Sequence, residues 1–252
     1  MNIKLSNLLI ILNFMKTPPK CLLLATLLTI NASAQSPLRI EWSSATIVQT
    51  ITDSDGNAIN AADYAIELGG FGNGFVPTGD NIDEWVSNWQ VFDAVTTPDD
   101  DAGDIFVSGS GTDARFAGAD FLDTDQTSLS LDSNGTDVFS AGLQAYVFIR
   151  NSDITGPDSE WLLYTSQEGV DWEFPAVAGS QLQQPLNFSL GEADEFLFGA
   201  GNGVVGPGEV GPNAPTDFAL RTHTFVPEPS TPLLLLASAL GLACRRRRVA
   251  GA

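Results

Sequence analysis

Short stretches in which apolar and polar residues alternate dominate the middle of the chain. Leu38, Ile40 and Trp42 alternate with polar neighbours, and residues 46–51 are rich in β-branched side chains. This alternation is typical of strands that bury one face, and β-branched residues fit the pleated surface of a sheet. The turn-forming residues 53–57 separate this region from a further alternating stretch at 64–68. We therefore predict a hairpin across residues 46–68.

Further short stretches with strand character follow along the chain, with Gly, Asp and Asn between them. They comprise residues 105–108, 115–117, 128–131, 143–149, 161–164, 172–174, 186–190, 195–198 and 218–225. The stretch at 143–149 is apolar on both faces, so we expect it in the centre of a sheet. Many short strands with such turns predict an all-β fold, an antiparallel β-sandwich of the jelly-roll-like kind.

One short helix is expected within this β-rich region. Asn81 can cap it with Glu84 at the third helical position, and Trp85, Trp89 and Phe92 then share one face. A parallel α/β fold would need regular crossover helices, which the pattern does not provide. Residues 199–215 are rich in Gly and Pro, and we expect them to form a long surface loop.

The N-terminal segment has the three parts of a signal peptide. Lys16 and Lys20 precede an apolar run at 21–30, and Ala32-Ser33-Ala34 provides small residues for cleavage. We predict that residues 1–34 are removed by a cut between Ala34 and Gln35. Met15 is an alternative start of the chain, because the residues before it have a separate apolar run at 8–12.

The last 27 residues, 226–252, also have three parts. Val226, Pro227, Glu228 and Pro229 come first, and the two prolines keep the backbone extended. An apolar run at 232–244 follows, which would be helical in lipid. Four arginines then favour the cytoplasmic side of a membrane: Arg245, Arg246, Arg247 and Arg248. This order predicts a membrane-anchoring tail behind an exported domain at residues 35–225.

The Val-Pro-Glu-Pro motif, the apolar run and the terminal arginines together resemble the PEP-CTERM sorting signal of exported bacterial proteins. The resemblance covers about the last tenth of the chain. It implies that an exosortase-type membrane protease recognises and removes the tail after transient membrane anchoring. It also implies a destination at the cell surface or outside the cell, often together with exopolysaccharide.

Charge is distributed very unevenly along the chain. Between Lys20 and Arg245 there are four arginines and 31 acidic residues, which gives 4 − 31 = −27. So acidic a segment repels nucleic acid and anionic lipid, which excludes nucleic-acid binding. Cys21 and Cys244 both lie in segments that we expect to be removed, so disulfides and thiol chemistry are not expected in the mature domain.

Calcium is the one ion that the Asp-rich turns suggest, since it prefers carboxylate and carbonyl oxygens. Asp53, Asp55 and Asn57 have the spacing that opens an EF-hand loop. Ala58 stands where that loop needs glycine, and Tyr64 stands where it needs a bidentate glutamate. Asp132-x-Asn134-Gly135-x-Asp137 and Asp120-x-x-Asp123-x-Asp125 are equally incomplete calcium patterns. Solvated turns are therefore favoured over calcium ligation, which stays open as the alternative, and no other cofactor is expected.

Candidate catalytic residues are not distinctive. His223 is the only histidine, and without a Gly-x-Ser-x-Gly elbow it is expected to be an ordinary strand residue. The five tryptophans can fill a core or stack on sugars, and core packing is favoured. We expect a non-catalytic surface or matrix protein that associates with exopolysaccharide. Two alternatives remain open: a calcium-dependent carbohydrate-binding module and a secreted glycan-cleaving enzyme.

Overall fold

The computed structural model describes residues 36–44, 50–60, 62–95, 105–108, 114–167, 172–177, 185–207 and 219–225. The predicted signal peptide and the predicted membrane-anchoring tail both lie outside these residues. The described residues form three sheets. No helix among them is long and apolar enough to cross a membrane.

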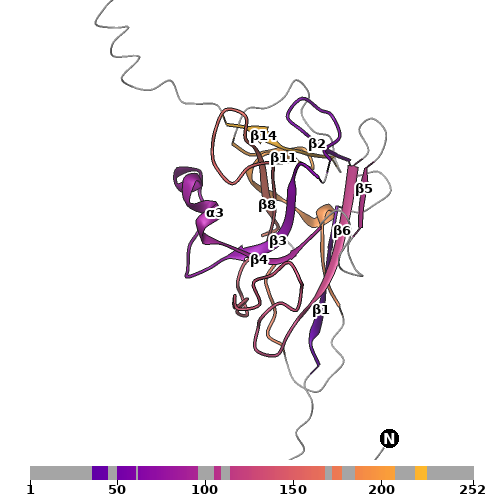
Figure 1. The fold of residues 1–252 in the computed structure, drawn as a ribbon, viewed down its shortest axis with the longest axis vertical. Coiled ribbons are helices and arrows are strands. Elements are labelled where there is room, and N and C mark those ends of the chain that lie inside the picture. The colour runs from indigo at the N-terminus through magenta and orange to yellow at the C-terminus, as the bar shows by residue number, and fades with distance from the viewer. Residues whose placement is uncertain are drawn as a thin grey trace, which may run out of the picture. The chain divides into compact units, whose positions relative to one another are not determined.

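Sheets I and II are the two large sheets, and Figure 1 shows β1, β5 and β6 of sheet I to one side of β3, β4 and β8 of sheet II. Sheet I has the order β5 (Ile105–Ser108), β6 (Ala114–Leu122), β1 (Leu38–Ser43), β9 (Leu186–Ser189). Sheet II has the order β10 (Glu195–Phe198), β8 (Glu160–Thr165), β7 (Tyr146–Arg150), β3 (Ala65–Phe71), β4 (Trp89–Ala94), with β14 (His223–Thr224) also on β8.

Sheet III is built from very short strands. Its order is β12 (Val204–Val205), β11 (Ala200–Gly201), β13 (Ala219–Arg221), β2 (Thr50–Thr52). The pairs β2–β13 and β1–β9 are parallel, and the other strand pairs in the three sheets are antiparallel. The predicted all-β, antiparallel-rich fold with one short helix is therefore confirmed. The stretch that we expected at a sheet centre is β7, which lies in the middle of sheet II with all five residues buried.

The inner core lies between sheets I and II. Alternate residues of β1 point into it, and Ile40 and Trp42 are at most 1% exposed. Their partners from the other elements include Leu68, Phe92, Phe116, Val147, Tyr164 and Phe188. Burying side chains of this size contributes about 1.5–3 kcal/mol each to folding. This enclosed apolar layer is the main source of the domain's stability.

A second apolar group, the outer cluster, covers the opposite face of sheet II. It consists of Phe71, Trp85, Tyr146, Phe148, Trp161, Leu163 and Phe198. Among the residues that the structure describes, the regular elements over it are the 3-10 helix η3 (Gly79–Glu84) and the α-helix α3 (Trp85–Asn88), and Figure 1 shows α3 on the side of sheet II away from sheet I. Trp85 stacks on Trp161 at 6.2 Å between ring centroids. Sheet II is thus buried on both faces.

The predicted helix is in the right place, but its cap and its apolar face are wrong. Thr78 is the N-cap, and Asn81 instead accepts hydrogen bonds from the Thr78 amide (2.8 Å) and Trp85 Nε1 (2.9 Å). Trp89 begins strand β4, so Trp85 and Phe92 do not share a helix face. Their spacing of seven residues fits a helix, yet Trp85 packs in the outer cluster and Phe92 in the inner core.

The predicted hairpin across residues 46–68 is also wrong. The turn at 53–57 does form, but it brings Thr52 opposite Ala58 instead of joining two long strands. β2 pairs with β13, while β3 pairs with β4 and β7. Residues 128–131 and 172–174 make single bridges and no strand. Part of the expected loop at 199–215 is a small hairpin of β11 and β12.

Candidate functional site

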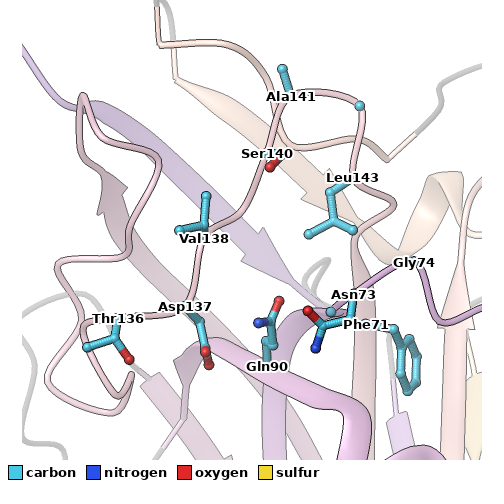
Figure 2. A pocket seen from close by; sticks show the side chains of 12 residues that line it. Phe71, Asn73, Gly74, Gln90, Thr136, Asp137, Val138, Ser140, Ala141 and Leu143 are labelled. Carbon is cyan, nitrogen blue, oxygen red and sulfur yellow. The ribbon is translucent and has the colours of Figure 1, made fainter.

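A pocket of about 570 Å³ lies where β3 ends and β4 begins, beneath the loop 136–143. Its polar lining comes from Asn73, Gln90, Thr136, Asp137 and Ser140. Figure 2 shows the amides of Asn73 and Gln90 pointing toward the hollow, with Asp137 on its opposite side. Ligand pockets commonly have volumes of about 300–1,000 Å³, so this hollow has the size of a binding site.

One wall of the pocket is a tight turn at residues 72–75. The Phe75 amide donates to the Gly72 carbonyl at 3.0 Å, and Asn73 (φ 56°) and Gly74 (φ 73°) both have left-handed backbone. Consecutive left-handed residues define a type I′ turn, for which Asn-Gly is the preferred pair. The turn carries the Asn73 side chain on its tip, where it is exposed.

Gln90 reaches the pocket because Gly72 has no side chain. A Cβ atom at Gly72 would lie 2.7 Å from Cδ and 2.8 Å from Nε2 of Gln90. The Gln90 amide therefore occupies the space above Gly72, next to Asn73 in the same wall. Glycine at this position sets where the amide lies.

The opposite wall, the loop 136–143, is held by an aromatic anchor. Phe139 is fully buried in the inner core, with its ring centroid 5.2 Å from Phe92 and 4.8 Å from Phe174. The Phe174 amide also donates to the Leu143 carbonyl at 2.9 Å. Within this wall, Asp137 accepts a hydrogen bond from Asn134 Nδ2 at 2.6 Å. Both walls are thus fixed by packing and by backbone hydrogen bonds.

The lining favours a particular chemistry. Amide side chains both donate and accept hydrogen bonds, hydroxyl groups do the same, and a carboxylate accepts them. None of the described lining residues is basic, so the pocket lacks the usual partner of an anionic group. Val138 and Leu143 add apolar surface. The arrangement suits an uncharged ligand with several hydroxyl groups.

The calcium candidates with the EF-hand spacing, Asp53, Asp55 and Asn57, lie elsewhere, in the turn that follows β2. Asp53 accepts hydrogen bonds from the backbone amide of Asn57 at 2.8 Å and from its side chain at 3.0 Å. These contacts within the turn account for the Asp-x-Asp-x-Asn spacing. Among the described residues, no group of three or more acidic, His or Cys side chains is placed to hold a metal ion.

The tryptophans and His223 occupy the positions that core packing predicts. Trp42, Trp85, Trp161 and Trp172 are at most 1% exposed, so they cannot serve as sugar platforms. Trp89 is half-buried and donates to Glu67 Oε2 at 2.7 Å. His223 is a buried strand residue whose Nδ1 lies 3.3 Å from the Pro207 carbonyl, and burial lowers its pKa.

The pocket residues cannot be recognised as one group from the sequence. Asn73 and Gly74 lie in the Gly-rich stretch 69–74, and Asn-Gly is a strong turn signal. Gln90 and Asp137 come from separate parts of the chain, and no local pattern connects them. The signal that was available in the sequence was the turn, and the pocket depends on the tertiary fold.

The last described residue, Phe225, is fixed at the edge of sheet II. Its amide donates to the Ser159 carbonyl at 3.3 Å, and its ring stacks on Phe198 at 4.7 Å. The domain is therefore a β-sandwich whose final strand ends where the predicted sorting motif begins.

A family model of the PEP-CTERM protein-sorting motif matches residues 225–248. The chain thus carries this sorting motif, and it is an exported protein that an exosortase processes and that is sorted to the cell envelope or surface. No curated protein and no solved structure matches the chain. The match lies outside the sandwich apart from Phe225, so the role of the domain has to be inferred from its own residues.

Proposed function

We propose that the sandwich is a non-catalytic component of the cell surface or extracellular matrix that associates with exopolysaccharide. The observation that carries this proposal is the position of the sorting motif. Its match starts at Phe225, directly after β14 (His223–Thr224), so no linker or further domain separates the sandwich from the tail. The sandwich itself is therefore the cargo that sorting delivers.

The route to the surface follows from the charges at the two ends. A signal peptide that is cut between Ala34 and Gln35 would carry the domain across the membrane. The arginines at 245–248 would hold the C-terminus inside, and the apolar run at 232–244 would anchor the chain transiently. Pro227 and Pro229 would then keep the motif extended outside the membrane, where a membrane-embedded protease can reach it.

A non-catalytic role is supported by the contacts of two carboxylates, Glu67, which is buried, and Glu160, which is partly buried. Glu67 is paired with Arg150, and Nη1 of the arginine lies 2.5 Å from Oε2 of the glutamate. Glu160 accepts hydrogen bonds from three hydroxyl groups, those of Ser54 (2.6 Å), Tyr64 (2.7 Å) and Thr222 (2.6 Å), and its pKa is lowered. Glu67 joins β3 to β7, and Glu160 joins β8 to the segments that carry Ser54, Tyr64 and Thr222, so both carboxylates stabilise the fold.

Sorting is tested by replacing Pro227, Glu228 and Pro229 with alanine in the full chain, expressed in a bacterium that has an exosortase. We expect export to continue while the tail is retained, which leaves the protein in the inner membrane fraction at its longer mass. A control chain with Ser230→Ala and Thr231→Ala should be processed normally. Release of the triple-alanine chain at the wild-type rate would contradict this mechanism.

The matrix role is tested on the processed wild-type protein. It should sediment with exopolysaccharide purified from the same cells, and digestion of the polymer should release it. The polymer should keep its chain length during prolonged incubation. A fall in chain length would overturn the non-catalytic role, and recovery of all the protein in the soluble fraction would overturn the association.

A further inference from the structure

We infer that the pocket formed by the turn 72–74, Gln90 and the loop 136–143 binds an uncharged saccharide unit through its hydroxyl groups. This inference deepens the proposed function, since it names the site and the class of polymer. It begins from two polar side chains that make no hydrogen bond to the rest of the described protein. Among the described residues, neither the Asn73 amide nor the Gln90 amide has a hydrogen-bond partner.

The unused groups match the hydrogen-bonding pattern of a sugar. Each amide supplies two N–H donors and a carbonyl acceptor, and a sugar hydroxyl donates once and accepts twice. Adjacent hydroxyls on a ring can therefore bond to Asn73 and Gln90 together, while Asp137 accepts from a third. Hydrogen bonds that involve a charged partner are roughly twice as strong as neutral ones, so Asp137 should fix the orientation of the ring.

Apolar surface in the same pocket suits the C–H faces of a sugar ring. Val138 is 49% exposed, and Leu143 is partly buried at the edge of the inner core. In Figure 2 these two side chains flank the hollow above Gln90. A ring seated between them would cover apolar area that the fold leaves exposed to water, which favours binding by about 25 cal/mol per Å².

Charge selects among saccharides. The segment between Lys20 and Arg245 has a formal charge of −27, and Asp137 adds a carboxylate inside the pocket. A polymer of uronic acids or sulfated sugars would be repelled over the whole approach, and the described pocket lining offers it no cation. Neutral sugars avoid this cost, so they are the class that the pocket fits.

The pocket is also preformed. The turn is fixed by its backbone hydrogen bond, and Phe71 beneath it packs against Trp89 and Tyr146 at 5.1 and 5.4 Å. The facing wall is fixed by Phe139 in the inner core. A rigid site loses little conformational entropy when a ligand binds, so even a few hydrogen bonds give measurable affinity.

The test uses the processed protein, without its signal peptide and sorting tail but otherwise intact, and the same form of each variant. Each is applied to an array of neutral, amino-containing and uronic-acid oligosaccharides and to exopolysaccharide from the same cells. Asn73→Gly removes one amide and keeps the left-handed backbone that the turn needs. Gly72→Ala adds a methyl group that displaces the Gln90 amide while leaving every polar group in the chain. Each should weaken binding to neutral saccharide about three- to tenfold, the effect of one lost hydrogen bond.

Two controls match these variants. Gly79→Ala adds a methyl group where a Cβ would meet no atom within 4 Å, and Asn187→Ala removes an exposed amide from the edge strand β9. Both should bind like wild type. Thermal melting of all four variants separates a lost contact from a lost fold, and a variant that melts far below wild type is replaced by Gln90→Leu.

The outcomes separate this inference from the proposed function. If the wild-type protein binds the exopolysaccharide and the pocket variants bind it equally well, the pocket assignment is wrong and the association stands. If the wild-type protein binds neither the polymer nor any neutral saccharide, both are wrong. Preference for uronic-acid oligosaccharides overturns the ligand class.

Discussion

Two carboxyl groups are buried on opposite faces of sheet II, and they differ in the charge of the groups that donate hydrogen bonds to them. Glu67 of β3 lies on the outer face, where Arg150 donates to it from Nη1 (2.5 Å) and Nη2 (3.2 Å). Asp93 of β4 lies on the inner face, where it accepts hydrogen bonds from Trp42 Nε1 (2.6 Å) and the Ser130 hydroxyl (3.0 Å). Glu67 has a cation beside it, whereas the donors to Asp93 are neutral.

The difference shows in the proton affinity of Asp93. Burial raises its pKa from 3.8 to about 7, although the hydrogen bonds from Trp42 and Ser130 oppose the shift. The negative charges of Asp120 and Asp132 raise it further. On the outer face, the Arg150 guanidinium lies 4.9 Å above the Phe148 ring and also reaches Asp153. The outer face is thinly covered and has room for the long side chain of Arg150, which neutralises Glu67. The inner layer is closed, so the charge of Asp93 is removed by binding a proton instead.

The largest effect that we expect comes from breaking the outer pair. Arg150→Met leaves Glu67 buried without its cation, and it should lower the free energy of unfolding by about 3–5 kcal/mol. Urea denaturation at neutral pH measures this change. The double variant Glu67→Leu, Arg150→Met is the control, because it removes both charges, and it should regain most of the loss. An Arg150→Met protein as stable as wild type would show that the pair contributes nothing.

A smaller effect, of opposite sign, is expected on the inner face. Because its folded-state pKa is raised, neutral Asp93 contributes stability that is complete below about pH 3.8 and is lost as the pH rises to about 7. Asp93→Asn removes this loss, so it should stabilise the protein at pH 7 by on the order of 2 kcal/mol. Denaturation midpoints at pH 4 and pH 7 test this. Equal differences between variant and wild type at both pH values would contradict the protonation of Asp93.

The smallest effect concerns the cover of the outer cluster. Asn81 accepts from Thr78 and Trp85 and donates to the Val76 carbonyl at 2.9 Å, so Asn81→Ala should cost about 1 kcal/mol. The near-ultraviolet circular dichroism, to which the stacked pair Trp85 and Trp161 contributes, should weaken with it. Asn88→Ala removes an amide that donates to the Glu84 carbonyl at the other end of the same segment, and it should leave this signal intact. If the near-ultraviolet signal weakened in both Asn81→Ala and Asn88→Ala, the whole segment 79–88 would be detaching from sheet II.

Much of the β-rich pattern could be predicted from the sequence because it is local. Strand β1 alternates in burial as its residues alternate in polarity, and β7 is apolar on both faces. The spacing of Trp85 and Phe92 misled the prediction because the chain changes from helix to strand at Trp89, so the two residues lie on opposite faces of sheet II. The register of β3 and β4 also shifts between Leu68 and Gly69, which leaves Phe92 without a partner in β3 and turns Asp93 to the same face as Phe92.

The sorting tail could be predicted from the sequence and the pocket could not, because the tail is local in sequence and the pocket is not. Val226 to Pro229, the apolar run and the arginines are contiguous, so their chemistry can be recognised without a fold. The pocket brings Asn73 and Gln90 against a loop that begins more than forty residues later in the chain. Parallel pairing of β2 with β13 was equally hidden, because two three-residue strands carry too little sequence pattern to identify each other.

That parallel pair sets the order in which the chain can fold. Thr52 bonds to the Leu220 carbonyl and to Arg221, 169 residues further along the chain. Closing so large a loop costs conformational entropy before the contact contributes any stabilising free energy, so such long-range pairing forms slowly. Sheet III therefore stays open until residues 219–221 arrive beside β2. Completion of sheet III requires residues 50–52 and residues 219–221, from near the two ends of the described domain, to be present together.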